Sequence, residues 1–456
     1  MSRYFFYGTK LSAFEQMMMS VPNFERRRNG VIVRAGAKIL KVDSINQFTE
    51  KTYDQLLENN FSKFHNRKLD KRLQKMMSCL EGNSQALIQK IANELRVYCN
   101  ENCMLFSSYE YRFVFYVTAY EDKEDLMCFC EKIENVLESL LSSESITAGL
   151  GIVEIDDENK QDIEMLLKNV LIASEKAIHA EDQTIRTCFF NEEMSSQIAR
   201  EQVITYELSR IASGENIERL FLQYQPILDV PSNRICGFEA LARLNCDDFG
   251  LVSPLEFIPI AEKSRLIVPL GEIIIRKALE FLKAIQNNGH YGISVSINIS
   301  GIQLLQVDFV KNLLQQIEET NVNPSNIGLE LTESIFTSNY EEINATLAKL
   351  KSCGMKIAID DFGTGYSSLA RERELNANCL KIDKFFIDKL LFLSDEEAIT
   401  GDIISMAHKL GHCVIAEGVE DERQLNYLKH HGCDKIQGYL IGKPLSERDA
   451  LEIIEK

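Results

Sequence analysis

The amino-acid sequence predicts an α/β protein in which a C-terminal (β/α)8 barrel of the TIM-like kind follows an α+β domain. Two observations favour this fold class. From about residue 216 onward, short apolar segments alternate regularly with helical patterns, as in a (β/α)8 barrel. The residues before 190 mix both kinds of segment without that alternation. We therefore expect a first domain at 1–190, a connecting helix at 191–215 and a barrel at 216–456.

The first 190 residues show strand and helix patterns around a predicted hairpin. Two short apolar segments are separated by the polar turn SSYEY, which indicates neighbouring strands. In the helical segments apolar residues recur at three- and four-residue spacing, as at Ile133, Val136, Leu137 and Leu140. The expected strands are Ala37–Val42, Met104–Phe106, Arg112–Thr118 and Ile146–Ile155, and the expected helices are Ser84–Cys99, Asp122–Leu141 and Gln161–His179.

The segment 191–215 has the apolar spacing of a single helix face. Ile198, Val203, Leu208 and Ile211 recur on one side, and Gly214 is suited to end the helix. We expect this helix to act as a spacer between the two domains, with a signalling role as the alternative.

Eight strand patterns follow, with helical patterns between most of them. Their number and alternation predict the barrel, and a doubly wound open sheet is the alternative. No glycine-rich dinucleotide fingerprint follows the first strand, which disfavours that alternative. The expected strands are Phe221–Ile227, Ile235–Leu244, Ile293–Ile299, Ile327–Glu333, Lys356–Asp361, Cys379–Asp383, Cys413–Gly418 and Lys435–Leu440.

The charge of the chain restricts its ligands. The formal net charge is −18, which argues against binding to nucleic acid polymers, because such binding uses Lys and Arg to replace counterions. A small phosphate ligand stays compatible with this charge if metal ions supply the positive charge. Acidic residues gathered at one site would then be the means of holding those ions.

The sequence gives no sign of a membrane span or of a signal peptide. The nearest apolar run, VIVRAGAKILKV, carries three basic residues, so we expect a cytoplasmic protein without a membrane span. Twelve cysteines are scattered along the chain without paired CxxC motifs. We expect them to be reduced thiols rather than zinc ligands.

Polar side chains of one chemical kind follow the predicted barrel strands. A lone carboxylate at a strand end is usually solvated, but strand ends converge at one face of a (β/α)8 barrel, where so many charges would repel one another. Carboxylate and amide oxygens suit Mg²⁺ or Mn²⁺, and two such ions about 3.5–4 Å apart serve phosphodiester cleavage. The candidate residues are Glu239, Asn298, Glu330, Glu333, Asp360, Asp361, Lys381, Glu417, Glu420 and Gln437.

The barrel segment resembles the EAL-domain cyclic di-GMP phosphodiesterases, from about Glu207 to the last residue. The resemblance is carried by an ordered set of motifs rather than by one of them. The matching strings are YQPI at Tyr224–Ile227, EALAR at Glu239–Arg243, PLEFIPIAE at Pro254–Glu262, NIS at Asn298–Ser300, ELTES at Glu330–Ser334, DDFGTGYSSL at Asp360–Leu369, KID at Lys381–Asp383, AEGVE at Ala416–Glu420 and QGY at Gln437–Tyr439.

The resemblance implies metal-dependent hydrolysis of cyclic di-GMP to linear pGpG, in bacterial second-messenger signalling, with two Mg²⁺ or Mn²⁺ ions. It also implies a homodimer formed through the EAL domain. By motif, the ligands of the two ions would be Glu239, Asn298, Glu330, Asp360, Asp361 and Glu417, with Asp360 as the bridge.

The same resemblance assigns the remaining roles. Lys381 would lie beside the attacking water, while Gln225 and Arg243 would contact the substrate and Gln437 would help to hold the network. Glu333 would brace the DFGTGYSS loop. Leu244 stands where the family often has Trp, a departure that affects no ion ligand.

The first 190 residues more weakly resemble a GGDEF, or diguanylate cyclase, domain. The signature position reads SSYEY at Ser107–Tyr111, so serines replace both glycines and Tyr109 replaces Asp. The inhibitory Arg-x-x-Asp motif is also missing, since Arg96 is followed by Val, Tyr and Cys99. We therefore expect a degenerate domain without cyclase activity that has a regulatory or dimerising role, with a nucleotide or a protein as the possible regulator.

Two other functions stay open. The chain could be a catalytically silent receptor that binds cyclic di-GMP and acts through a partner protein, as degenerate pairs of this kind do. It could also be a scaffold without a ligand, if the acidic residues are incidental. The complete set of candidate ligands favours the enzyme.

Overall fold

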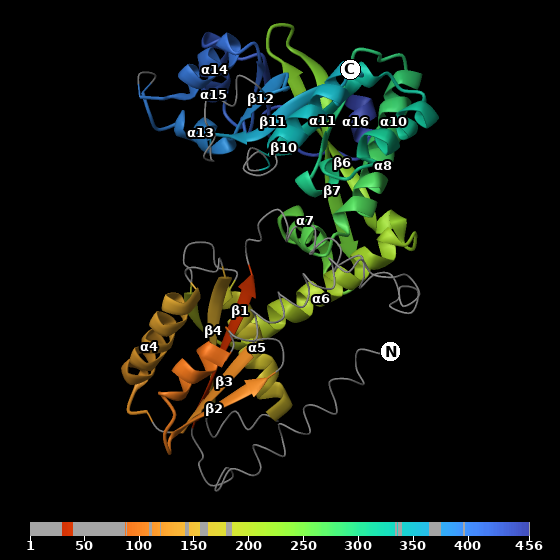
Figure 1. Ribbon diagram of the computed structural model, residues 1–456. Helices are drawn as coiled ribbons and strands as arrows, with labels where there is room; N and C mark the ends of the chain where they lie inside the picture. Colours follow the sequence, from red (N-terminus) through yellow and green to blue (C-terminus); the bar gives the residue numbers. More distant parts are fainter. Residues whose placement is uncertain are drawn as a thin grey trace. The chain divides into compact units, whose positions relative to one another are not determined.

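The computed structural model describes residues 30–39, 87, 89–108, 112–118, 120–141, 146–155, 163–178, 185–332, 335, 340–363, 375–394 and 397–455. The chain forms two compact units, Met1–Ala199 and Arg200–Lys456 (Figure 1). The division falls inside helix α6 (Glu192–Ala212), which lies within the helix expected at 191–215. Within the described part of the chain, no helix combines the length and the apolar character that a membrane crossing needs.

Unit 1 contains a five-stranded sheet in the order β2-β3-β1-β4-β5. The central strand β1 is antiparallel to both of its neighbours, and β4 is parallel to β5. The bounds of the strands are β1 Gly30–Ile39, β2 Cys103–Ser108, β3 Arg112–Val117, β4 Ile146–Ile155 and β5 Ile185–Phe189.

Two strands of this sheet differ from the prediction. We expected a strand at Ala37–Val42, but β1 begins seven residues earlier, because each of its ten residues pairs with a residue of β4. Its length is thus set by its partner strand, which the local sequence does not reveal. Strand β5 was not predicted, since its sequence, IRTCF, shows no regular alternation of apolar and polar residues.

Helices cover both faces of the sheet in unit 1. Successive side chains of β3 point to opposite faces, so Phe115 packs in the cluster with α4 (Lys123–Leu141) and Tyr116 in the cluster with α5 (Ile163–Ile178). A Cβ atom at Gly151 would lie 2.3 Å from the Ser174 backbone nitrogen, so the close packing of α5 on β4 requires glycine there. Unit 1 is therefore a three-layer α+β domain.

Unit 2 is a closed barrel, as predicted, because β6 pairs with both β7 and β14. The closed sheet excludes the doubly wound alternative. The barrel strands are β6 Leu220–Asp229, β7 Arg234–Cys246, β9 Ser294–Asn298, β10 Ile327–Thr332, β11 Lys356–Phe362, β12 Cys379–Ile382, β13 Cys413–Ala416 and β14 Lys435–Gln437, with β8 Gly250–Val252 added beside β7.

The barrel departs from a regular (β/α)8 barrel in its first strand. β6 is antiparallel to both β7 and β14, whereas the other barrel strands pair in parallel. Four residues, 230–233, connect β6 to β7, and a parallel crossover needs about a dozen or more. The chain reverses there with Asn233 in the left-handed region, at φ 54°.

Helices surround the barrel, and successive side chains of a strand point alternately toward these helices and toward the barrel interior. In β11, Ile357 and Ile359 belong to the core formed with the helices, whereas Ala358 lies in a separate cluster and Asp360 points to the site described below. The helices are α7 Pro254–Lys263, α8 Ile267–Asn287, α9 Gly301–Leu304, α10 Phe309–Thr320, α11 Tyr340–Ser352, α13 Lys384–Lys389, α14 Thr400–Lys409, α15 Glu422–His430 and α16 Glu447–Glu455.

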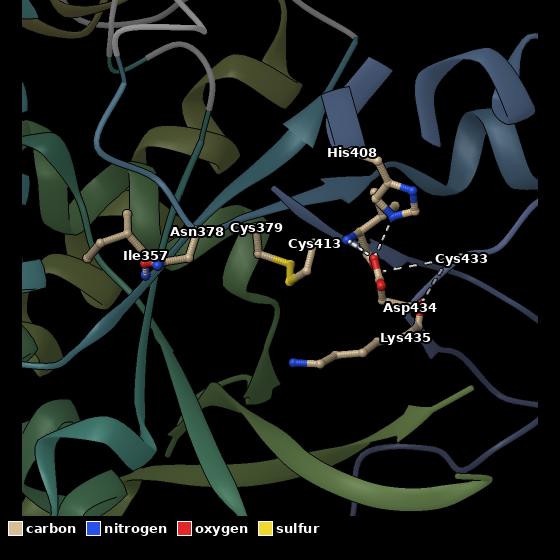
Figure 2. The surroundings of a disulfide bond; sticks show 9 residues. Ile357, Asn378, Cys379, His408, Cys413, Cys433, Asp434 and Lys435 are labelled. Carbon is tan, nitrogen blue, oxygen red and sulfur yellow. Dashed lines mark hydrogen bonds and ion pairs between the residues drawn. A yellow bond between two sulfur atoms is a disulfide. The ribbon is translucent and has the colours of Figure 1, made fainter. Parts of the chain in front are cut away.

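Two cysteines form a disulfide at the amino-terminal end of the barrel strands. Cys379 and Cys413 are the first residues of β12 and β13 and directly opposite each other, with their Cα atoms 4.4 Å apart (Figure 2). The expectation of reduced thiols is therefore wrong for this pair, since strand register brought together two residues 34 positions apart. The nine other described cysteines are free.

Candidate active site

The side chain of Lys381 lies at the centre of a carboxylate cluster inside the barrel. Its Nζ atom is 2.5 Å from Glu330, 2.6 Å from Glu417, 3.2 Å from Asp360 and 3.6 Å from Glu239. Lys381 and Glu330 are 0% exposed. Each residue comes from a different strand or strand end, so the barrel assembles the cluster from segments far apart in sequence.

Burial and mutual repulsion shape the charge of this cluster. Burial, with repulsion from Glu239 and Asp360, raises the pKa of Glu330 well above its ordinary value. The same causes raise the pKa of Glu417 to about 8. Burial alone would lower the pKa of Lys381, but the surrounding carboxylates outweigh it and raise this pKa well above normal. Lys381 is therefore the cation that offsets part of the buried negative charge.

A shift in strand register brings two successive aspartates to the same site. In a regular strand Asp360 and Asp361 would point to opposite faces. The pairing of β11 with β12 shifts between Ile359 and Phe362, and Asp361 has φ 56°, in the left-handed region. Aspartate adopts this conformation more readily than most residues. Burial of the side chain and repulsion from Asp360 raise the pKa of Asp361.

The carboxylates form two overlapping groups with metal-ligand spacing. Glu239, Glu330 and Asp360 form one group, while Asp360, Asp361 and Glu417 form the other. In each group, one ligand oxygen per residue lies within 4.8 Å of the others. Asp360 belongs to both groups, which is the arrangement that a ligand bridging two ions requires.

Amide side chains orient Glu239 within the cluster. Asn298 Nδ2 donates to Glu239 Oε1 at 2.7 Å, and Gln437 Nε2 donates to Glu239 Oε2 at 2.6 Å. Gln437 also donates to Gln225 Oε1 at 3.2 Å. Burial alone would raise the pKa of Glu239, but attraction to Lys381 and these hydrogen bonds outweigh it and lower the pKa. Glu239 is therefore held as a carboxylate.

Arg243 interacts electrostatically with Glu239 of the cluster and is held by Gln223, which was not among the predicted site residues. Its Nε atom donates to Gln223 Oε1 at 2.7 Å, and its Nη1 atom donates to its neighbour's carbonyl oxygen. Gln223 precedes Gln225 by two positions on β6, so both share a face of the strand. The two-residue spacing from Gln225 is the feature of the sequence from which Gln223 could have been predicted.

The structure thus brings together most of the predicted site residues. Glu420 is instead bound by Lys384 Nζ at 2.9 Å, on α13. Glu333 and the loop after Gly363 lie outside the described residues, as does Tyr109 of unit 1. The residues that meet around Lys381 or contact that cluster are Gln225, Glu239, Asn298, Glu330, Asp360, Asp361, Glu417 and Gln437.

The closed barrel with an antiparallel first strand and the carboxylate groups of metal-ligand spacing together define the class of protein, an α/β barrel with a candidate metal site. The family model for the EAL domain matches residues 211–444, and the chain belongs to the EAL domain family. A weaker similarity of unit 1 to GGDEF domains stays a prediction.

Relatives with recorded functions support this membership. The chain is 32% identical over 67% of its length to the bifunctional diguanylate cyclase/cyclic di-GMP phosphodiesterase MucR of Pseudomonas aeruginosa, covering 44% of that protein. It is 30% identical over 71% of its length to the cyclic di-GMP phosphodiesterase PA2567 of the same organism, covering 55%. The chain thus spans about half the length of these relatives.

Solved structures agree with the sequence comparison. The phosphodiesterase of MucR in complex with cyclic di-GMP matches with a TM-score of 0.51 at 34% identity, over 54% of this chain and 99% of that one. The EAL enzyme Bd1971 in its cGMP-bound form matches with a TM-score of 0.55 at 31% identity, over 75% of this chain and 81% of that one.

Proposed function

We propose that this chain hydrolyses cyclic di-GMP to linear pGpG with two divalent ions. The observation that carries the proposal is the pair of carboxylate groups that share Asp360 around Lys381. The names of two relatives state cyclic di-GMP phosphodiesterase activity, which supports the choice of substrate. A silent receptor would not need this whole set of ligands.

The residues present fit Mg²⁺ or Mn²⁺. All of the donors are carboxylate or amide oxygens, as these hard cations prefer. Glu330 Oε1 is buried and has no hydrogen-bond partner among the described residues, as expected of an atom reserved for an ion. In the proposal Glu239, Asn298, Glu330 and Asp360 hold one ion, and Asp360 and Asp361 hold the other, with Glu417 in support.

The remaining roles follow from charge and position. Bound ions would supply charge stabilisation for the phosphodiester and a water of lowered pKa. Because the carboxylates raise the pKa of Lys381, it acts as a cation that orients the water or neutralises a phosphoryl oxygen rather than as a base. Gln437 keeps Glu239 in place, while Arg243 and Gln225 contact the substrate.

The proposal extends to the rest of the chain. Glu333 braces the loop that follows β11, and a homodimer forms through the EAL domain. Unit 1, with its helix-covered sheet, is a degenerate GGDEF-like domain that regulates the barrel through a nucleotide or a protein partner, and the domain limits are those predicted at 190 and 215. A cytoplasmic location remains part of this proposal.

The test is a turnover assay on purified protein with cyclic di-GMP and Mg²⁺ or Mn²⁺. We expect linear pGpG from the wild type and a loss of at least about a hundredfold in kcat for Asp360→Ala, because this change removes the shared ligand. Chromatographic separation of pGpG from substrate measures both rates. A wild type that binds cyclic di-GMP yet forms no more pGpG than the variant would refute the enzyme and leave the receptor.

A further inference from the structure

A glutamate on α7 binds the turn that follows Asn298. Glu262 Oε1 accepts a hydrogen bond from Ser300 Oγ at 2.5 Å. Ser300 is the second residue after Asn298 and caps the amino terminus of α9. The contact therefore joins α7 to the segment that ends β9 and carries one of the proposed ion ligands.

That turn is fixed by a small number of bonds. The Ile299 backbone N–H donates to the Glu330 carbonyl oxygen at 2.9 Å, and the Ser300 backbone N–H donates to Gln303 Oε1 at 3.1 Å. Gln303 packs closely against Gly271 of α8, where a Cβ atom would lie only 1.8 Å from the Gln303 Nε2 atom. The other described side-chain bonds of Ser300 are made with residues of α9, whereas Glu262 contacts Ser300 from a different helix, α7.

Helix stability does not explain a carboxylate at position 262. Glu262 is in the last turn of α7, where the negative end of the helix dipole disfavours an acidic side chain. The helix itself is held in the barrel core by the buried side chains of Phe257, Ile260 and Ala261, and more exposed ion pairs join it to α6. Arg200 donates two hydrogen bonds to Glu256, at 2.5 and 2.9 Å, and Lys263 Nζ donates to Glu201 at 2.7 Å. Glu262 therefore projects from a firm support toward Ser300.

We propose that Glu262 is a positioning residue for the ion site. By accepting the Ser300 hydrogen bond it fixes the turn that directs Asn298 toward Glu239, to which Asn298 donates at 2.7 Å. The inference rests on the proposed two-ion function and deepens it. Groups that orient a ligand in this way change metal affinity without touching the metal.

Mn²⁺ binding to the full-length, nucleotide-free protein tests this role directly, by titration calorimetry. Glu262→Ala is expected to weaken binding by roughly tenfold to a hundredfold, the usual effect of losing such a partner. Glu262→Gln keeps an acceptor oxygen and should stay within about threefold of the wild type. Ser300→Ala should weaken binding as well, and the double variant should be no weaker than the single ones, since all lose the same bond.

Glu272→Ala is the matched control. Glu272 on α8 also accepts a hydrogen bond from another helix, from Asn312 Nδ2 at 2.9 Å, so its loss should leave Mn²⁺ binding unchanged. Thermal unfolding of each variant establishes that it is folded. The proposal is overturned if Glu262→Ala binds Mn²⁺ normally, if only the KM for cyclic di-GMP changes, or if the control loses equal affinity. A wild type that binds no Mn²⁺ would instead overturn the two-ion function on which the inference rests.

Discussion

The two ends of the barrel use the same strands for opposite purposes. At the carboxyl ends, Glu330, Asp360 and Glu417 surround Lys381. These carboxylates would repel one another if no cation were present. At the amino ends, an apolar cluster that includes Ile227 and Cys379 fills the interior, and a disulfide joins two strands. One end of the barrel is thus apolar and covalently linked, while the other gathers closely spaced charges, which matches the usual division between a structural and a catalytic face in such barrels.

The largest effect is expected where the charge is buried. Lys381→Met leaves the carboxylates without their cation and should lower the free energy of unfolding by about 3–5 kcal/mol in metal-free protein. It should also lower kcat by at least about a hundredfold. Saturating Mn²⁺ should reduce the loss of stability, because the ions replace the missing charge. Denaturant titrations with and without Mn²⁺ measure the difference.

Lys384→Met is the control for this prediction. Lys384 also contacts two carboxylates, those of Asp388 and Glu420, but it is 46% exposed. Exposed pairs contribute little, so this variant should lose less than about 1 kcal/mol. Equal losses for the two variants would show that the cluster around Lys381 is solvated like the surface.

The opposite end should respond in stability and hardly in activity. Replacing both Cys379 and Cys413 by serine removes a covalent link across 34 residues. By the loop-entropy relation, this double variant should have a free energy of unfolding lower by about 4 kcal/mol. The KM for Mn²⁺ should not change. Thiol titration of the denatured, non-reduced wild-type protein checks that the disulfide is present. Twelve reactive thiols, instead of at most ten, would show that the bond does not form.

The contrast between the ends also explains what the sequence could predict. Strand ends rich in Asp and Glu are visible locally, and the convergence of barrel strands then places Glu330 and Asp360 together. The disulfide depends instead on register between β12 and β13, which no local pattern in the chain contains. The left-handed backbone of Asp361 likewise depends on the register shift between β11 and β12. The sequence therefore predicted which residues meet better than it predicted the backbone geometry that brings them together.

The smallest effect should separate substrate binding from ion binding at the reactive end. Arg243 lies beyond Glu239 on β7, so Arg243→Ala should raise the KM for cyclic di-GMP by roughly tenfold to a hundredfold while Mn²⁺ affinity stays the same. Gln223→Ala only releases the Arg243 side chain, and should raise the KM by about twofold to tenfold. If the double variant is no worse than Arg243→Ala, Gln223 acts through the arginine. If Mn²⁺ affinity falls in either variant, substrate and ion sites are coupled, and the reactive end works as one unit rather than two.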